Sequence, residues 1–110
     1  MELTQEQIGT VHIVAPAGEI DANSSPQLDK ALRALIDAGV SQLVVDMSKV
    51  SYTSSAGLRA VLWGLKQARA KSGDLRLAGL QPQVKEVFDL AGFLPLFRIF
   101  DSADLAAKSF

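Results

Sequence analysis

Two adjacent serines, Ser54 and Ser55, stand at the point where the sequence changes from strand to helix. An apolar strand, Leu43 to Val45, ends at Asp46, a short polar loop follows, and the serines open a strongly amphipathic segment that we expect Ser55 to cap. A serine at a helix start has an accessible hydroxyl beside backbone N–H groups that the helix leaves unpaired. Such a position favours a phosphate, because the free N–H groups and the helix dipole both attract negative charge. The pattern therefore predicts a serine that is modified rather than one that attacks a substrate.

The pattern around Ser55 argues against a catalytic serine. A nucleophile elbow needs glycine two positions before and two after the serine, and here Thr53 occupies the first of these positions while Gly57 fits the second. His12 is the only histidine, and it falls within a predicted strand without an evident acid–base partner. We interpret it as a surface strand residue. We expect no metal site and no phosphate-cradling glycine loop.

Asp46 raises a second possibility, because phospho-accepting aspartates of response-regulator receivers also follow a central strand. Receivers additionally need an acidic pair after the first strand and a lysine that ends a later strand. The corresponding places here hold Ala15-Pro16-Ala17 and Arg98-Ile99-Phe100. A receiver-like or ligand-binding α/β domain is thus the weaker hypothesis. We expect Asp46 instead to brace the following loop by accepting backbone N–H groups from residues 48–52.

Composition limits the classes of function that need to be considered. The chain has 110 residues, 48% of them hydrophobic and 21% charged, a formal net charge of −1, and no cysteine. These values indicate a single domain, residues 1–110, with one hydrophobic core. A net charge near zero gives no positive surface for nucleic acid or an anionic membrane. The polar N-terminus is unlike a signal peptide. We expect a cytoplasmic protein without a cofactor.

Hydrophobic periodicity predicts an α/β domain. A hairpin comes first, strands and helices then alternate, and this order favours a mixed sheet of four to five strands with about four helices, mainly packed on one face. The first helix is expected to begin with Ser25 as N-cap and Pro26 as first helical residue, and the last to be capped by Asp101. The expected strands end near Ile8 and cover 11–15, 43–45, 74–78 and 96–100, and the expected helices cover about 25–38, 55–71, 82–91 and the region after 101.

Three sequence blocks in this order resemble the STAS domain, specifically the stand-alone bacterial anti-sigma-factor antagonists. The blocks are Gly18-Glu19-Ile20-Asp21, Val44-Val45-Asp46-Met47-Ser48 and Val50-Ser51-Tyr52-Thr53-Ser54-Ser55-Ala56-Gly57-Leu58. The resemblance implies a STAS-like sheet with helices on one face. It also implies phosphorylation of the hydroxyl two positions before the glycine, which is Ser55, with Ser54 as second choice because many relatives have an aspartate there.

Further residues are candidates for a partner-binding surface beside Ser54 and Ser55. Asp21 has two interpretations of similar weight: it caps the turn into the first helix, or it contributes with Asn23 and Ser24 to that surface. Trp63, the only tryptophan, lies by periodicity almost opposite the apolar stripe of its helix, on the same side as Arg59. Tryptophan on such a face either covers another element or contacts a partner.

The resemblance implies a non-enzymatic phospho-switch. In its unphosphorylated form the protein is expected to bind an anti-sigma factor that is also a serine kinase, to be released when this partner phosphorylates Ser55, and to be reset by a PP2C-type phosphatase. One alternative is the same partner switching with a non-sigma output, such as secretion, biofilm or second-messenger control. Nucleic acid and membrane are not expected as partners.

Overall fold

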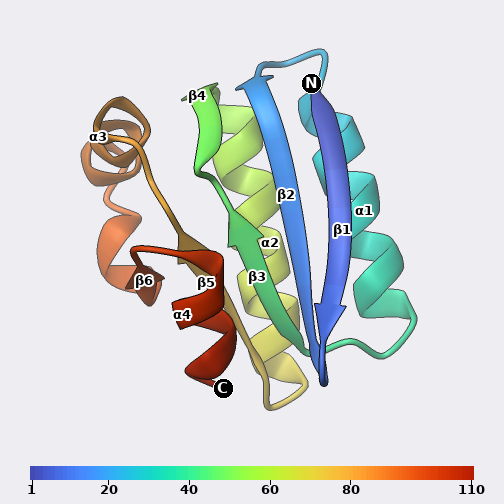
Figure 1. Ribbon diagram of the computed structural model, residues 1–110. Coiled ribbons are helices and arrows are strands. Elements are labelled where there is room, and N and C mark those ends of the chain that lie inside the picture. The colour runs from blue at the N-terminus through green and yellow to red at the C-terminus, as the bar shows by residue number, and fades with distance from the viewer.

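The computed structural model describes residues 1–110 as one twisted sheet with helices on both faces (Figure 1). The strand order is β1-β2-β3-β5-β6, and β4 pairs with β2 beyond the end of β3. β1 runs antiparallel to β2, and every other pairing is parallel. The strands are β1 Glu2–Ile8, β2 Val11–Ile20, β3 Gln42–Asp46, β4 Lys49–Thr53, β5 Asp74–Ala78 and β6 Ile99–Phe100.

The long strand β2 pairs with two parallel strands, one after the other along its length. Its first half pairs with β3, from His12 opposite Leu43 to Val14 opposite Val45. Its second half pairs with β4, ending with Ile20 opposite Thr53. Pro16 lies between these two stretches, where no N–H is needed for either partner, and this explains why β2 continues beyond the proline at which we expected it to end.

The helices cover the two faces of the sheet unequally. α1 and α2 lie side by side on one face, behind the sheet in Figure 1, whereas the short α4 lies in front of it. The core that includes residues of α1, α2 and α3 contains 18 buried side chains, while the one beneath α4 contains six. The helices are α1 Ser25–Asp37, α2 Ser55–Ala70, α3 Pro82–Leu90 and α4 Ala103–Lys108, with a 3₁₀ turn, η1, at Leu94–Leu96.

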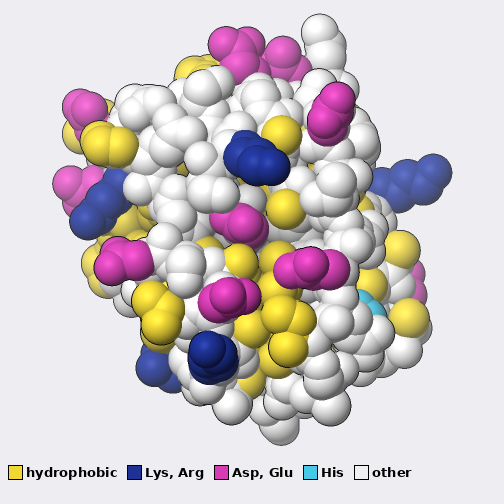
Figure 2. Space-filling view, viewed as in Figure 1, with side chains coloured by type: hydrophobic (Ala, Val, Ile, Leu, Met, Phe, Trp, Pro, Cys, Tyr) yellow, Lys and Arg dark blue, Asp and Glu magenta, His cyan; other side chains and the backbone are white.

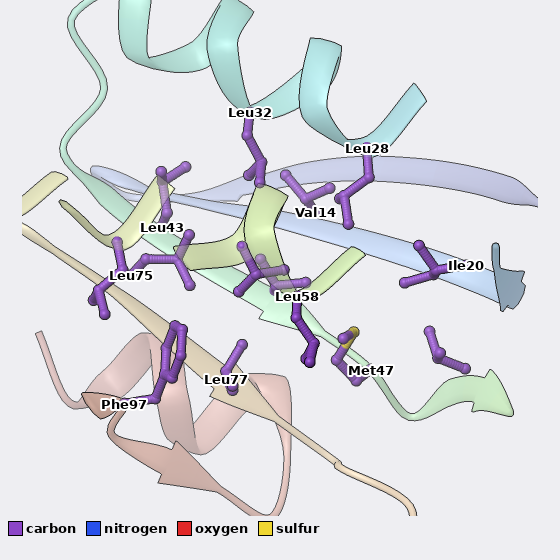
Figure 3. Packing of buried hydrophobic residues seen from close by; sticks show 14 of the residues in the cluster. Val14, Ile20, Leu28, Leu32, Leu43, Met47, Leu58, Leu75, Leu77 and Phe97 are labelled. Carbon is purple, nitrogen blue, oxygen red and sulfur yellow. The ribbon is translucent and has the colours of Figure 1, made fainter. Parts of the chain in front are cut away.

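The larger core explains why α1 and α2 form. In Figure 3, Leu28 and Leu32 point from α1 toward Val14 of the sheet, and Leu58 projects from α2 into the same layer. Each of these side chains is at most 3% exposed. Burial of one leucine contributes about 2 kcal/mol, so these helices are stabilised chiefly by packing on the sheet.

The predicted α/β class and the one-sided arrangement of the main helices are confirmed, but several boundaries were wrong. β4 occupies a segment that we expected to be a loop. β6 is shorter than the strand expected at 96–100, because the 3₁₀ turn η1, which contains Pro95, includes the first residue of that range. The sheet therefore has six strands rather than four to five. The N-cap of α1 is Ser24 rather than Ser25, and the N-cap of α4 is Ser102, whose Oγ accepts the Leu105 N–H at 3.2 Å, rather than Asp101. None of the helices combines the length and the hydrophobicity that a membrane span requires.

Candidate functional site

Ser54 and Ser55 have different roles at the start of α2. Ser54 is extended, and its Oγ accepts the Gly57 N–H at 3.3 Å, so Ser54 is the N-cap. Its own N–H donates to the Ile20 carbonyl oxygen at 2.7 Å. Ser55 is instead the first residue of the helix and is exposed, and its hydroxyl makes no hydrogen bond within the chain. Our expectation that Ser55 caps the helix was thus wrong by one residue, and the correction leaves the Ser55 hydroxyl free.

Gly57 allows the start of α2 to approach the sheet closely. A β-carbon at this position would fall well inside van der Waals contact with Thr53 Oγ1 and 2.8 Å from Ile20 Cγ2. Thr53 and Ile20 are both essentially buried, so neither can move aside easily. Gly57, which follows the predicted acceptor by two positions, is therefore also required for the packing of the loop.

Asp21 forms a compact turn between β2 and α1. Its Oδ1 accepts the N–H groups of Ser24 at 2.8 Å and Asn23 at 3.0 Å, while the Ser24 Oγ accepts the Asp21 N–H at 2.9 Å. Hydrogen bonds from Ser24, first from its backbone and then from its side chain, hold the pKa of Asp21 below its ordinary value. This geometry is that of the turn-capping interpretation. Asn23 is exposed, and its contact with a partner stays a prediction.

The topology brings the turn and the two serines to one end of the sheet. β2 and β4 are parallel neighbours, so Asp21, which follows β2, and Ser54, which follows β4, leave the sheet at the same edge. The hydrogen bond from Ser54 to Ile20 fixes the two segments to each other. We call the residues Asp21, Asn23, Ser24, Ser54 and Ser55 the acceptor loops.

A groove of about 400 Å³ begins beside Ser55 and runs between α1 and α2. Ala56, Ala60 and Trp63 of α2 line it together with Arg33 of α1. The Arg33 guanidinium lies 4.0 Å from the centre of the Trp63 ring, and its Nε is 2.8 Å from Asp29 Oδ2. Trp63 is partly exposed and packs against the core beneath Arg33 of α1, so it covers another element, while its contact with a partner stays a prediction.

Arg33 and Asp29 were not among the predicted site residues. Their spacing of four residues predicts an ion pair on a helix surface. Periodicity within one helix gives no information on which side chains of a second helix they meet. The Arg33–Trp63 contact therefore could not be found from sequence pattern alone.

Asp46 lies on the other side of the sheet from this groove. Its Oδ1 accepts the Ser48 N–H at 3.0 Å, which is one of the expected bonds, whereas the Val50 N–H donates to the Met47 carbonyl oxygen. Asp46 lines a hollow of about 330 Å³ with Glu2 and Lys49, on the face where Figure 2 shows acidic side chains around an apolar patch. No group of three or more His, Cys, Asp or Glu side chains is arranged to hold a metal ion.

The sequence is similar to proteins of a known family. The sequence matches the STAS domain family over residues 2–106. The chain belongs to the STAS family. This STAS domain is 39% identical to BtrV of Bordetella bronchiseptica, described as a candidate anti-sigma factor antagonist, over the whole chain and 95% of that protein. It is 33% identical to the anti-sigma-B factor antagonist of Bacillus subtilis over 93 residues, which are 84% of this chain and 79% of that protein.

The fold of this STAS domain also matches solved structures. SpoIIAA of Bacillus, an anti-sigma factor antagonist solved in its unphosphorylated form, superposes with a TM-score of 0.87 at 20% identity, over 98% of this chain and 95% of SpoIIAA. The phosphorylated form gives a TM-score of 0.79 over 98% of both chains. The identification of the family and the predicted STAS-like fold are both confirmed.

Proposed function

We propose that this STAS domain is an anti-sigma-factor antagonist that is switched by phosphorylation of Ser55. The unmodified domain binds an anti-sigma factor that is also a serine kinase, this kinase transfers phosphate to Ser55, and a PP2C-type phosphatase removes it. The domain acts in the cytoplasm as binding partner and substrate, not as an enzyme. Support comes from relatives named anti-sigma factor antagonists and from the description of SpoIIAA in a phosphorylated form.

The observation that carries the proposal is the difference between the two serines. Ser54 is engaged on both sides, through its Oγ and through its N–H, whereas the Ser55 hydroxyl is exposed and makes no hydrogen bond within the chain. A kinase can reach Ser55 without opening the fold. The same step at Ser54 would remove the cap of α2.

The switch follows from the electrostatics of the loop. A phosphate adds about −1.5 to −2 charges at neutral pH, and negative charge is favourable at a helix N-terminus. The modified domain therefore keeps its fold. In the complex, however, the phosphate would be a desolvated dianion where the partner accommodates a neutral hydroxyl. Burial of an unpaired charge costs several kcal/mol, and a loss of about 3 kcal/mol weakens binding roughly a hundredfold.

The proposed docking surface consists of the acceptor loops together with Arg59 and Trp63. Asn23 and Ser55 are exposed at the end of the sheet, and Arg59 and Trp63 continue the surface along α2. Tryptophan and arginine are among the residue types most enriched where a few side chains dominate the binding energy. We therefore assign the strongest contacts to the α2 side of the surface.

Phosphopeptide mapping tests the assignment of the acceptor. The domain is co-expressed with the kinase that co-purifies with it, and the modified residue is located by mass spectrometry. Phosphate is expected on Ser55 and is expected to disappear in Ser55→Ala. The matched control, Ser54→Ala, keeps an acceptor at 55 and should still be modified. Phosphate confined to Ser54 would contradict the proposal.

A charge substitution tests the switch itself. Ser55→Asp is expected to unfold at the same urea concentration as the wild type and to bind the partner kinase at least tenfold more weakly. Ser55→Asn, of equal size and without charge, should bind nearly as tightly as the wild type. Equal affinity of the Asp and Asn variants would show that charge is not what releases the partner.

A further inference from the structure

Ser55, Arg59 and Trp63 form a single row along α2. They are four residues apart in sequence, and side chains with this spacing are neighbours on a helix surface, with about 5–6 Å between their Cβ atoms. Arg59 and Trp63 line the α1–α2 groove, and Ala56, which follows Ser55, lines it as well. The row therefore leads from the modified hydroxyl directly into the groove.

Arg59 is the cation in this groove that has no acidic partner. Asp29, the carboxylate of the groove, is 2.8 Å from Arg33, and Arg59 makes no ion pair. The first turn of α2 contains no acidic residue that could pair with Arg59 instead. An exposed guanidinium with no counter-charge thus stands one helical turn after the phosphorylation site.

We propose that Arg59 binds the Ser55 phosphate within the same chain and is thereby withdrawn from the docking surface. This inference rests on the proposed function, because it needs a phosphate on Ser55. A guanidinium donates two parallel hydrogen bonds to a phosphate, a geometry that a lysine cannot offer. Phosphorylation then acts twice: it adds a dianion beside the partner and removes a cation from it. The phosphate also draws Arg59 toward the helix start and away from Trp63.

A titration of the phosphate tests the pairing without any kinase. Phosphoserine is incorporated at position 55 by genetic encoding, and the second pKa of the phosphate is measured by ³¹P NMR in the complete domain. A nearby guanidinium stabilises the dianion, so the pKa in the wild type should be about 0.5 pH unit lower than in Arg59→Gln. Arg59→Lys should give an intermediate value, because the charge remains and the two-fold hydrogen bond is lost.

Lys66→Gln is the matched control. Lys66 is an exposed cation on the same helix but lies outside the groove, eleven residues beyond Ser55, which is about 16 Å along the helix axis. At 0.15 M salt this distance is twice the Debye length, so its removal should leave the phosphate pKa unchanged. Equal pKa values in the wild type and in Arg59→Gln would overturn the proposal, as would an equal response to Lys66→Gln.

Trp63 provides a second measurement because it is the only tryptophan. If the phosphate moves Arg59, the emission of Trp63 changes on phosphorylation in the wild type and does not change in Arg59→Gln. An identical change in both forms would contradict the withdrawal of Arg59. Failure of these tests leaves the mapping of a kinase product to Ser55 unaffected, and a failed mapping leaves these results unaffected, so the two proposals are tested separately.

Discussion

The two ends of the sheet use carboxylates in opposite ways. At the end that carries the acceptor loops, Asp21 is partly exposed and accepts hydrogen bonds only from its own turn. At the other end, Asp74 is 8% exposed and is held by Arg69 at 3.1 Å and Arg76 at 3.0 Å. Arg76 also stacks on Phe110 at 3.9 Å, so this network attaches the C-terminal segment to β5.

The difference separates groups that stabilise the fold from groups that we propose for recognition. A buried carboxylate with two arginines cannot change partners without a large cost, whereas groups in an exposed turn can be modified or bound by another protein. The same contrast is repeated on a smaller scale by Ser54, which is engaged, and Ser55, which is free. The following substitutions test how complete this separation is.

The largest effect is expected at the Asp74 end. Asp74→Ala leaves the Arg76 side chain, only 12% exposed, without its carboxylate, and should lower the free energy of unfolding by about 3 kcal/mol. Asp29→Ala removes an exposed ion pair and is the control, with an expected cost below about 1 kcal/mol. Urea unfolding of both variants gives the comparison. Similar costs for the two would show that burial does not distinguish these ion pairs.

Gly57→Ala should be the most damaging change in the acceptor loops. The added methyl group meets buried Thr53 and Ile20, so we expect a loss of about 2 kcal/mol in stability together with reduced phosphorylation of Ser55. In Gly64→Ala the new methyl group meets the terminal Cδ1 of Leu75 rather than a stiff β-branched side chain, so stability should fall less while phosphorylation continues. Normal phosphorylation of Gly57→Ala would mean that the kinase does not need this packing.

Trp63→Ala tests a residue that packs on another helix and that we also propose for docking. Because the ring is partly buried beneath Arg33, we expect a loss of about 2 kcal/mol in unfolding free energy, and a similar loss in partner binding by the folded fraction. Leu90→Ala, at a side chain that is 80% exposed, should change neither quantity by more than about 0.5 kcal/mol. Unaltered affinity of the folded Trp63→Ala domain would remove Trp63 from the docking surface.

The paired serines should differ by one hydrogen bond. Ser54→Ala removes the N-cap of α2 and should cost about 1 kcal/mol, whereas Ser55→Ala should leave stability within about 0.5 kcal/mol of the wild type. Thermal unfolding of the two variants under identical conditions measures the difference. The reverse order would show that Ser55 caps the helix in solution.

The smallest effect concerns pH. The pKa of Asp21 is lowered in the folded domain, so the stability that its carboxylate contributes is present above its ordinary pKa near 3.8 and is lost as the pH falls through the lowered value. Urea unfolding between about pH 5 and about pH 2 should therefore show a shallower acid decline in Asp21→Asn than in the wild type. Parallel curves would indicate that the turn does not depend on ionised Asp21.

The sequence predicted the α/β class, the family and the position of the loop before α2, because these depend on periodicity and on short motifs. It did not predict β4, since Ser51 and Tyr52 are exposed and hide the strand period, and β2 is the only strand with which β4 pairs. It misplaced three helix caps by one residue, because adjacent polar residues compete for a cap and the backbone conformation decides between them.

Contacts between elements were the part that sequence could not reach. The Arg33–Trp63 stack joins α1 to α2, and the Asp74 network joins β5 to α2 and to the end of the chain. Both depend on which faces of separate elements meet after folding. The residue pattern within one helix or strand gives no information on which face of another element it will meet.

The hydrogen bond from Ser54 to Ile20 has a consequence for how the domain is sensed in a cell. The acceptor loops are assembled from two stretches far apart in the chain, so a peptide that spans Ser55 does not reproduce them, and neither does a nascent or heat-damaged copy. A kinase that requires both stretches would respond only to intact copies. The quantity reported to the partner is then the concentration of correctly folded protein, not the amount synthesised.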